Sequence, residues 1–203
     1  MSARRARLGG LLLVALTAGP AGAQPLPRTD MVPGSSWTTG EAREGAISRE
    51  YDGVFNRTEV RIRIVPQREG AADNPTTLYV SALFPGRAVK VTPDRVWVRA
   101  QSDLTVQPRR LRTQTLALSA DGAMIVNVSN PAPDSGAWLN YPCGSADACA
   151  FDGVVVPVPT ISFFRLLQAR RVFGEAMGFP FSLAPRHIEM LTEFARELVP
   201  RER

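Results

Sequence analysis

Two segments of the chain alternate apolar and charged positions with a period of two. Residues 59–64 read EVRIRI and residues 95–100 read RVWVRA. Successive side chains of a β-strand point to opposite faces, so this pattern predicts two strands that each bury one face. The segment between them, residues 76–84, reads TTLYVSALF and is apolar on both faces. It predicts a central strand of the same sheet.

A β-hairpin is predicted where residues 113–118 and 123–129 flank Ser119 to Gly122. The Asp-Gly pair inside that segment accepts the positive φ angles that a tight hairpin turn needs. Asp52-Gly53 and Asp152-Gly153 predict further turns, and Val154 to Val158 predicts the last strand.

The apolar period changes to about 3.6 residues after residue 159. Residues 160–177 predict a helix that Thr160 caps and Gly178 ends. Arg170 would lie on its apolar side, where a guanidinium reaches the rim or pairs with a carboxylate. Residues 178–183 are too few for more than a linking turn or strand, and residues 185–199 predict an amphipathic surface helix.

Together these elements predict a mainly β protein with C-terminal helices, in the α+β class. Strands separated by turns at short intervals indicate an antiparallel β-sandwich or open barrel, packed by the two C-terminal helices. We expect one domain over residues 46–203, with a β-rich body to about residue 159 and a helical part over residues 160–199. Residues 24–45, rich in Pro, Gly, Ser and Thr, predict a flexible N-terminal arm.

The first 23 residues have the pattern of a secretory signal peptide. Three arginines within the first seven residues precede a short apolar stretch, and AGA at residues 21–23 supplies a small-residue cleavage site. The apolar stretch is shorter than the roughly 20 residues that cross a bilayer, so we expect no transmembrane segment in the mature protein. The sequence therefore predicts export to the periplasm or the extracellular space.

The net charge and the small numbers of histidines and cysteines limit the kinds of partner and site that this chain can have. The chain has a net charge of +5, and removal of the three arginines of the predicted signal leaves +2. A nucleic-acid partner is therefore not expected. One histidine and two cysteines exclude sites built from several histidines or from four cysteines. We expect neither a metal ion nor a cofactor.

The two cysteines, Cys143 and Cys149, predict a disulfide. They enclose a polar segment of small residues that can bring the two sulfurs together, and an exported protein meets an oxidising environment. A redox-active pair is the alternative, but such pairs usually have two intervening residues at the start of a helix. The bond should fix the shape of one loop.

An arginine-rich face is the first candidate binding site. It consists of Arg61, Arg63, Arg95, Trp97 and Arg99, which occupy the polar positions of the two alternating strands. If the strands are neighbours, these residues form a surface that binds phosphate, sulfate or an acidic polymer. The alternative is an ordinary solvated sheet face that nearby carboxylates such as Glu50 and Asp94 neutralise.

Two weaker candidates concern hydrolysis. His187, the single histidine, lies on the apolar side of the second predicted helix, which favours a structural role. Asp134-Ser135-Gly136 matches the motif of aspartic proteases, but that chemistry needs two carboxylates and the triplet occurs once. Two carboxylates such as Asp134 and Asp152, near the loop between the cysteines, need only lie close together for acid–base work.

The sequence thus predicts an exported, non-enzymatic binding or accessory protein of the bacterial cell envelope, whose partner is an envelope protein or polymer. The alternatives are a small envelope hydrolase with paired carboxylates and a binder of acidic polymers through the arginine-rich face.

Overall fold

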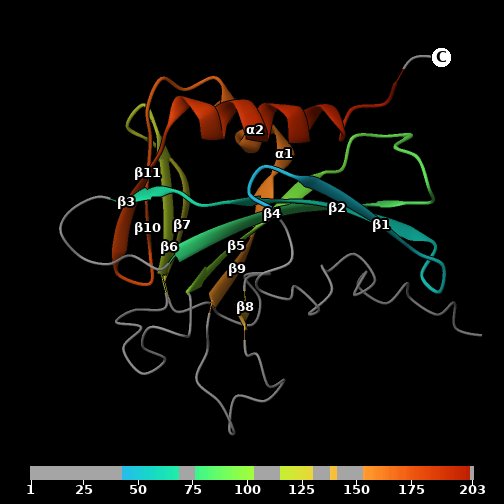
Figure 1. Ribbon diagram of the computed structural model, residues 1–203, viewed down its shortest axis with the longest axis horizontal. Helices are drawn as coiled ribbons and strands as arrows, with labels where there is room; N and C mark the ends of the chain where they lie inside the picture. The colour runs from blue at the N-terminus through green and yellow to red at the C-terminus, as the bar shows by residue number, and fades with distance from the viewer. Residues whose placement is uncertain (1–42, 69–75, 103–114, 130–137, 141–152, 202–203) are drawn as a thin grey trace, which may run out of the picture.

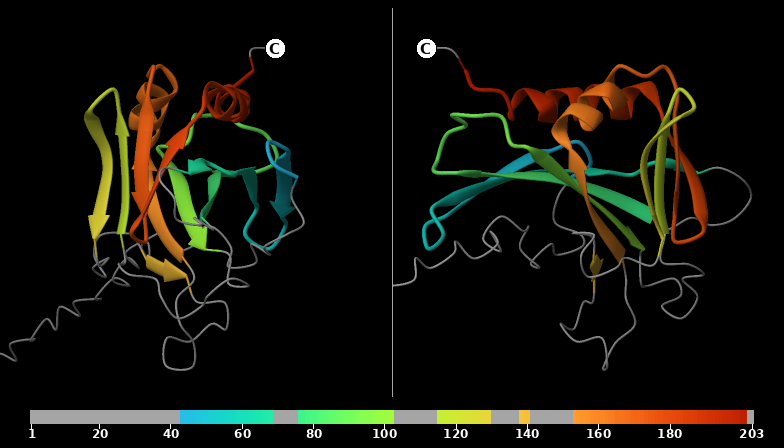
Figure 2. Two further views of the ribbon diagram at one scale, coloured as in Figure 1. Left: turned by 60° about the vertical axis from the view of Figure 1, so that its left-hand side comes forward. Right: turned by 180° about the vertical axis from the view of Figure 1, so that it is seen from behind.

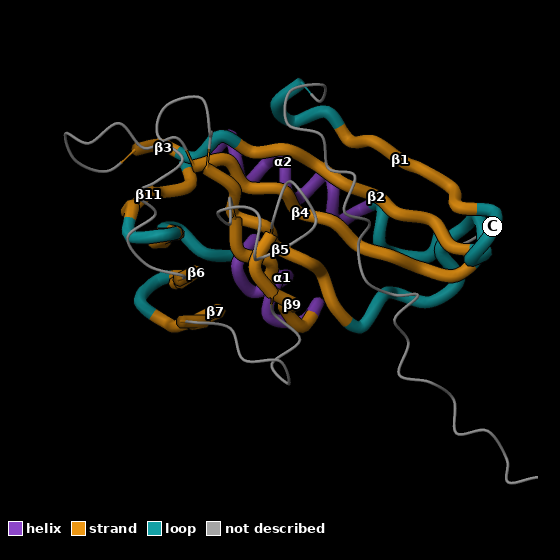
Figure 3. Tube along the Cα trace, turned by 90° about the horizontal axis from the view of Figure 1, so that it is seen from below, coloured by secondary structure: helices purple, strands orange, loops and turns teal. Residues whose placement is uncertain are grey.

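The protein folds into two antiparallel sheets with two helices near the C-terminus, as predicted (Figure 1). The computed structural model describes residues 43–68, 76–102, 115–129, 138–140 and 153–201. Strands of the five-stranded sheet run across the direction of the six-stranded sheet in Figure 1. The five-stranded sheet lies at one end of the molecule, and β1 and β2 extend to the other (Figures 1 and 3).

The six-stranded sheet contains all the alternating segments of the sequence. Its order is β1 (Ile47–Asp52), β2 (Arg57–Ile64), β4 (Thr76–Pro85), β5 (Arg95–Ser102), β9 (Gly153–Pro159) and β8 (Trp138–Asn140). Every second residue of β2 is buried, which confirms the predicted half-buried strand. β4 is buried on both faces between β2 and β5, as its sequence predicts.

The five-stranded sheet is built from two hairpins and one short strand. Its order is β3 (Gln67–Arg68), β11 (Phe179–Leu183), β10 (Val172–Ala176), β6 (Thr115–Ala120) and β7 (Ala123–Ser129). The predicted Asp-Gly turn joins β6 to β7, with Asp121 at φ 48° and Gly122 at φ 82°. A second turn with two positive φ angles, at Met177 and Gly178, joins β10 to β11.

Two helices pack on the apolar face of the six-stranded sheet (Figure 2). They are α1 (Thr160–Leu167) and α2 (Pro185–Arg196). The ring centroids of Phe163 in α1 and Phe194 in α2 lie 6.0 Å apart at 89°, a favourable edge-to-face contact. Both side chains are buried in one core that includes the apolar faces of both sheets.

The predicted helix over residues 160–177 was wrong in its second half. Helix α1 ends at Leu167, and Val172–Ala176 forms strand β10 instead. Gly174 in the middle of this segment is a poor helix former, and the Met177-Gly178 turn pairs β10 with β11. Thr160 is also not a side-chain cap: its hydroxyl donates to the carbonyl of Pro93 at 2.6 Å.

Arg170 therefore lies in the exposed turn between α1 and β10 and not among the apolar residues of a helix. Its backbone N–H and that of Arg171 donate to the Asp121 carboxylate at 2.9–3.1 Å. Asp121 thus ties the β6–β7 turn to the end of α1. The end of the predicted arm also contacts the body, because the Gly45 N–H donates to the Arg63 carbonyl at 2.9 Å.

Gly174→Ala should lower the free energy of unfolding by about 2 kcal/mol. A Cβ at Gly174 would lie 2.4 Å from the ring of buried Phe181 and 2.8 Å from the Ala117 carbonyl oxygen. At Gly53 the nearest atom to an added Cβ is 3.7 Å away, so Gly53→Ala is the matched control. Urea unfolding of the two variants measures the difference, and equal midpoints would contradict this packing.

Candidate functional site

The five predicted anion-binding residues lie on one face of the six-stranded sheet, opposite the core. Their strands, β2 and β5, are not neighbours, because β4 lies between them. In the register, Tyr79 of β4 pairs with Arg63 on one side and with Arg99 on the other. The Arg99 guanidinium carbon is 5.7 Å from the centroid of the Tyr79 ring, a cation–π distance.

Carboxylates neutralise two of the five residues. Arg61 donates to Glu50 at 2.5 Å and to the Ser48 hydroxyl at 3.1 Å. Arg95 binds the neighbouring Asp94 at 3.0 Å. Exposed ion pairs of this kind contribute little to stability, but they cancel local positive charge.

The other part of this face is buried. Trp97 is 4% exposed and packs with Leu83 and Val155 in a small apolar cluster, and Arg99 is also 4% exposed. Arg63 is half-buried. Within the described part of the chain, these five residues therefore do not form a continuous open arginine surface, and anion binding by them stays a prediction.

A second surface, which sequence reasoning missed, lies at the β1–β2 turn. Val54 is 88% exposed and Phe55 is 55% exposed. The Asp52 carboxylate accepts the N–H groups of both residues, at 2.9 and 3.2 Å, which fixes the turn. The signal was an apolar pair placed directly after an Asp-Gly turn point, where a solvated turn favours polar residues.

The β4–β5 loop, residues 86–94, lies at the same end of the molecule (Figures 1 and 2). The Gly86 N–H donates to the Asn56 carbonyl at 2.7 Å, so the loop is joined to the turn. Arg87 stacks on Tyr51, with 3.8 Å between the guanidinium carbon and the ring centroid. We call this surface the hairpin end, which comprises the exposed residues Val54, Phe55, Arg87, Lys90 and Val91.

His187 has a structural role at the start of α2. The ring is buried, and Nδ1 accepts the N–H of Ala184 at 3.0 Å, one half of a capping box. The other ring nitrogen, Nε2, faces Glu44 Oε1 at 3.5 Å. Arg186 Nε lies 3.1 Å from Nε2 and adds a positive charge. Burial, followed by Arg186, lowers the pKa of His187, while Glu44 opposes this shift.

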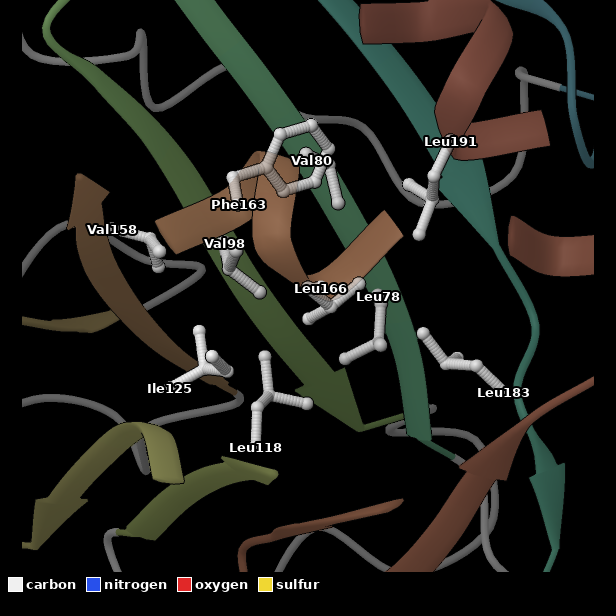
Figure 4. Close-up of a pocket in the computed structure, with 10 residues that line it drawn as sticks. All are labelled: Leu78, Val80, Val98, Leu118, Ile125, Val158, Phe163, Leu166, Leu183 and Leu191. Carbon is white, nitrogen blue, oxygen red and sulfur yellow. The ribbon is translucent and has the colours of Figure 1, made fainter. Parts of the chain in front are cut away.

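An apolar cavity of about 20 Å³ lies where the helices meet the two sheets (Figure 4). Leu78, Phe163 and Leu191 are among the ten apolar side chains that line it. A space of this size holds about one water molecule, and a water there would lack polar partners. The cavity is a packing void and not a ligand site.

Several predicted groups lie outside the described residues: Asp134-Ser135-Gly136, Asp152, Cys143 and Cys149. Within the described ranges, no three His, Cys, Asp or Glu residues are grouped so that they could hold a metal ion. Neither described helix is long and apolar enough to span a membrane.

His187→Gln should remove most of the pH dependence of stability between pH 7 and pH 5. The pKa of His187 is lowered from 6.5 in the folded chain, so the unfolded chain binds a proton first as the pH falls. The free energy of unfolding of the unmodified protein is therefore full above pH 6.5 and decreases below it, by at most about 1.4 kcal/mol per pH unit. Gln keeps an acceptor for the Ala184 N–H without titrating. Urea unfolding of both proteins without a polyhistidine tag, at several pH values, measures the free energy of unfolding. If its slope against pH were identical for the two proteins, the prediction would be contradicted.

Comparisons with known proteins return no relative. No family model, no curated protein and no solved structure matches the chain.

Proposed function

We propose that the protein is an exported, non-enzymatic binding or accessory protein of the bacterial cell envelope and that it binds through the hairpin end. The observation that carries this proposal is the exposure of Val54 and Phe55 on a turn that hydrogen bonds to the Asp52 carboxylate hold in shape. Single exposed apolar residues are common on protein surfaces. Two adjacent ones on a fixed turn, with a third, Val91, 75% exposed on the joined loop, favour an interaction surface.

The same end carries aromatic and cationic groups in ordered contacts. Arg57 lies over the Phe55 ring, with 4.8 Å between the guanidinium carbon and the ring centroid, and also faces Asp52 at 3.7 Å. Arg87 stacks on Tyr51. Aromatic residues and arginines are enriched at the centres of interfaces, where they bury much apolar surface and supply planar hydrogen-bond donors.

The hairpin end is a better candidate than the arginine-rich face. On that face Arg61 and Arg95 are paired with carboxylates, and Trp97 and Arg99 are buried. A partner would have to displace these contacts before it reached the guanidinium groups. At the hairpin end, Val54 and Phe55 already face solvent.

The second part of the proposal is export, which we infer from the sequence. The predicted signal peptide, residues 1–23, would direct the chain across the membrane into an oxidising compartment, where we expect Cys143 and Cys149 to pair. The partner is then an envelope component.

Site-specific photo-crosslinking tests this function. A photoreactive amino acid at Val54 should give reproducible adducts with an envelope component in intact cells of the host. The same group at Ile161, which is 62% exposed on α1, should give few or none. Val54 and Ile161 are both exposed β-branched residues, so the comparison isolates position. Equal adduct patterns at the two positions, or none at Val54, would overturn the proposal.

A further inference from the structure

We infer that the hairpin end binds the surface of an anionic lipid bilayer. This inference rests on the proposed function and names its partner. It follows from three features of the described residues: a protruding apolar turn, two cations without acidic partners, and the position of both at one end of the molecule.

The apolar part suits a bilayer better than a protein. The β1–β2 turn is a narrow projection at the far end of the six-stranded sheet (Figures 1 and 2). A stable protein interface buries roughly 1,200 Å² or more, which a four-residue turn does not supply alone. Aliphatic and aromatic side chains can instead enter the headgroup region of a bilayer, where Val54 and Phe55 would lose contact with water.

The charged part is complementary to acidic headgroups. Arg87 and Lys90 are exposed, and neither has a carboxylate partner among the described residues. The neighbouring Arg49 does face an acid, Glu197, at 3.6 Å, and it also donates to the Arg87 carbonyl at 2.6 Å. The Arg87 backbone is therefore fixed, while its charge remains available to a phosphate.

The apolar and charged parts are joined as one unit. In addition to the Gly86 to Asn56 hydrogen bond, the Thr58 hydroxyl donates to the Gly86 carbonyl at 2.6 Å. The turn and the loop form one end of the long direction of the described body (Figure 1). A flat bilayer can thus reach both without meeting α2 or the five-stranded sheet.

Vesicle flotation tests this inference with protein recovered from the exported fraction. Vesicles of phosphatidylglycerol should bind the protein at least about tenfold more strongly than vesicles of phosphatidylcholine in about 0.1 M salt. Phe55→Ser should lower the partition coefficient about tenfold, because the apolar anchor is lost. Arg87→Gln should lower it about fivefold, and this effect should shrink in about 0.5 M salt.

Ile161→Ser and Arg165→Gln are the matched controls. Both residues are exposed on α1, one helical turn apart, and supply the same kinds of side chain at another place. Neither should change vesicle binding. Thermal unfolding should be the same for Phe55→Ser as for the unmodified protein, and Val54→Ser provides a second variant of the same anchor.

The outcomes separate this inference from the proposed function. Absence of vesicle binding, equal binding to both lipids, or equal loss with the α1 controls would overturn the lipid partner. If Val54 still gave protein adducts in cells, the proposed function would stand without it. Self-association that Phe55→Ser abolishes, without vesicle binding, would identify a second copy as the occupant and overturn the inference. Absence of adducts at Val54 would overturn both.

Discussion

The contact of α1 with both sheets is the interaction on which the fold depends. This helix is eight residues long, yet it packs on β5 and β9 of one sheet, on β6 and β7 of the other, and on α2. Phe163 and Leu166 are buried at this junction, and each contributes about 1.5–3 kcal/mol through loss of contact with water. The small apolar void beside them shows that the two sheets and the helices meet without full interlocking. Any change in the start or length of α1 would alter both sheets together.

Because both faces of the six-stranded sheet are largely buried, the sheet has few places for exposed binding groups. Its inner face carries the core, and Trp97, Leu83 and Val155 are buried on the other face. Polar groups there must be partnered or shielded, because an unpaired buried charge is costly. Half-buried Arg61 meets this requirement with Glu50, and buried Arg99 lies over the Tyr79 ring, whereas Arg95 is exposed beside Asp94. Exposed binding side chains are therefore favoured at the ends of the strands, where the β1–β2 turn and the β4–β5 loop lie.

The sequence alone predicted those elements whose local pattern fits only one kind of secondary structure. Alternation over residues 59–64 and the Asp121-Gly122 turn correspond to β2 and the β6–β7 hairpin. Residues 172–176 were ambiguous, because Val172 and Ala176 share a face both in a helix and in a strand. The segment is a strand because it pairs with β6 and β11. Local periodicity carries no information on such long-range pairing. The condition that β2 and β5 are neighbours was not met for a similar reason: strand order is set by long-range pairing, and β4 lies between them.

The hairpin end shows how a fold can keep apolar side chains in solvent. The Asp52 carboxylate accepts two backbone N–H groups of the turn, and the Tyr51 hydroxyl donates to the Asn56 side chain at 3.0 Å. The turn is thus held by polar contacts from its flanking residues and does not need Val54 or Phe55 for its shape. Val54 and Phe55 lie outside the core, so their replacement should change stability little. Binding and folding are therefore separable at this surface, which means that a loss of binding there reports on the contact itself.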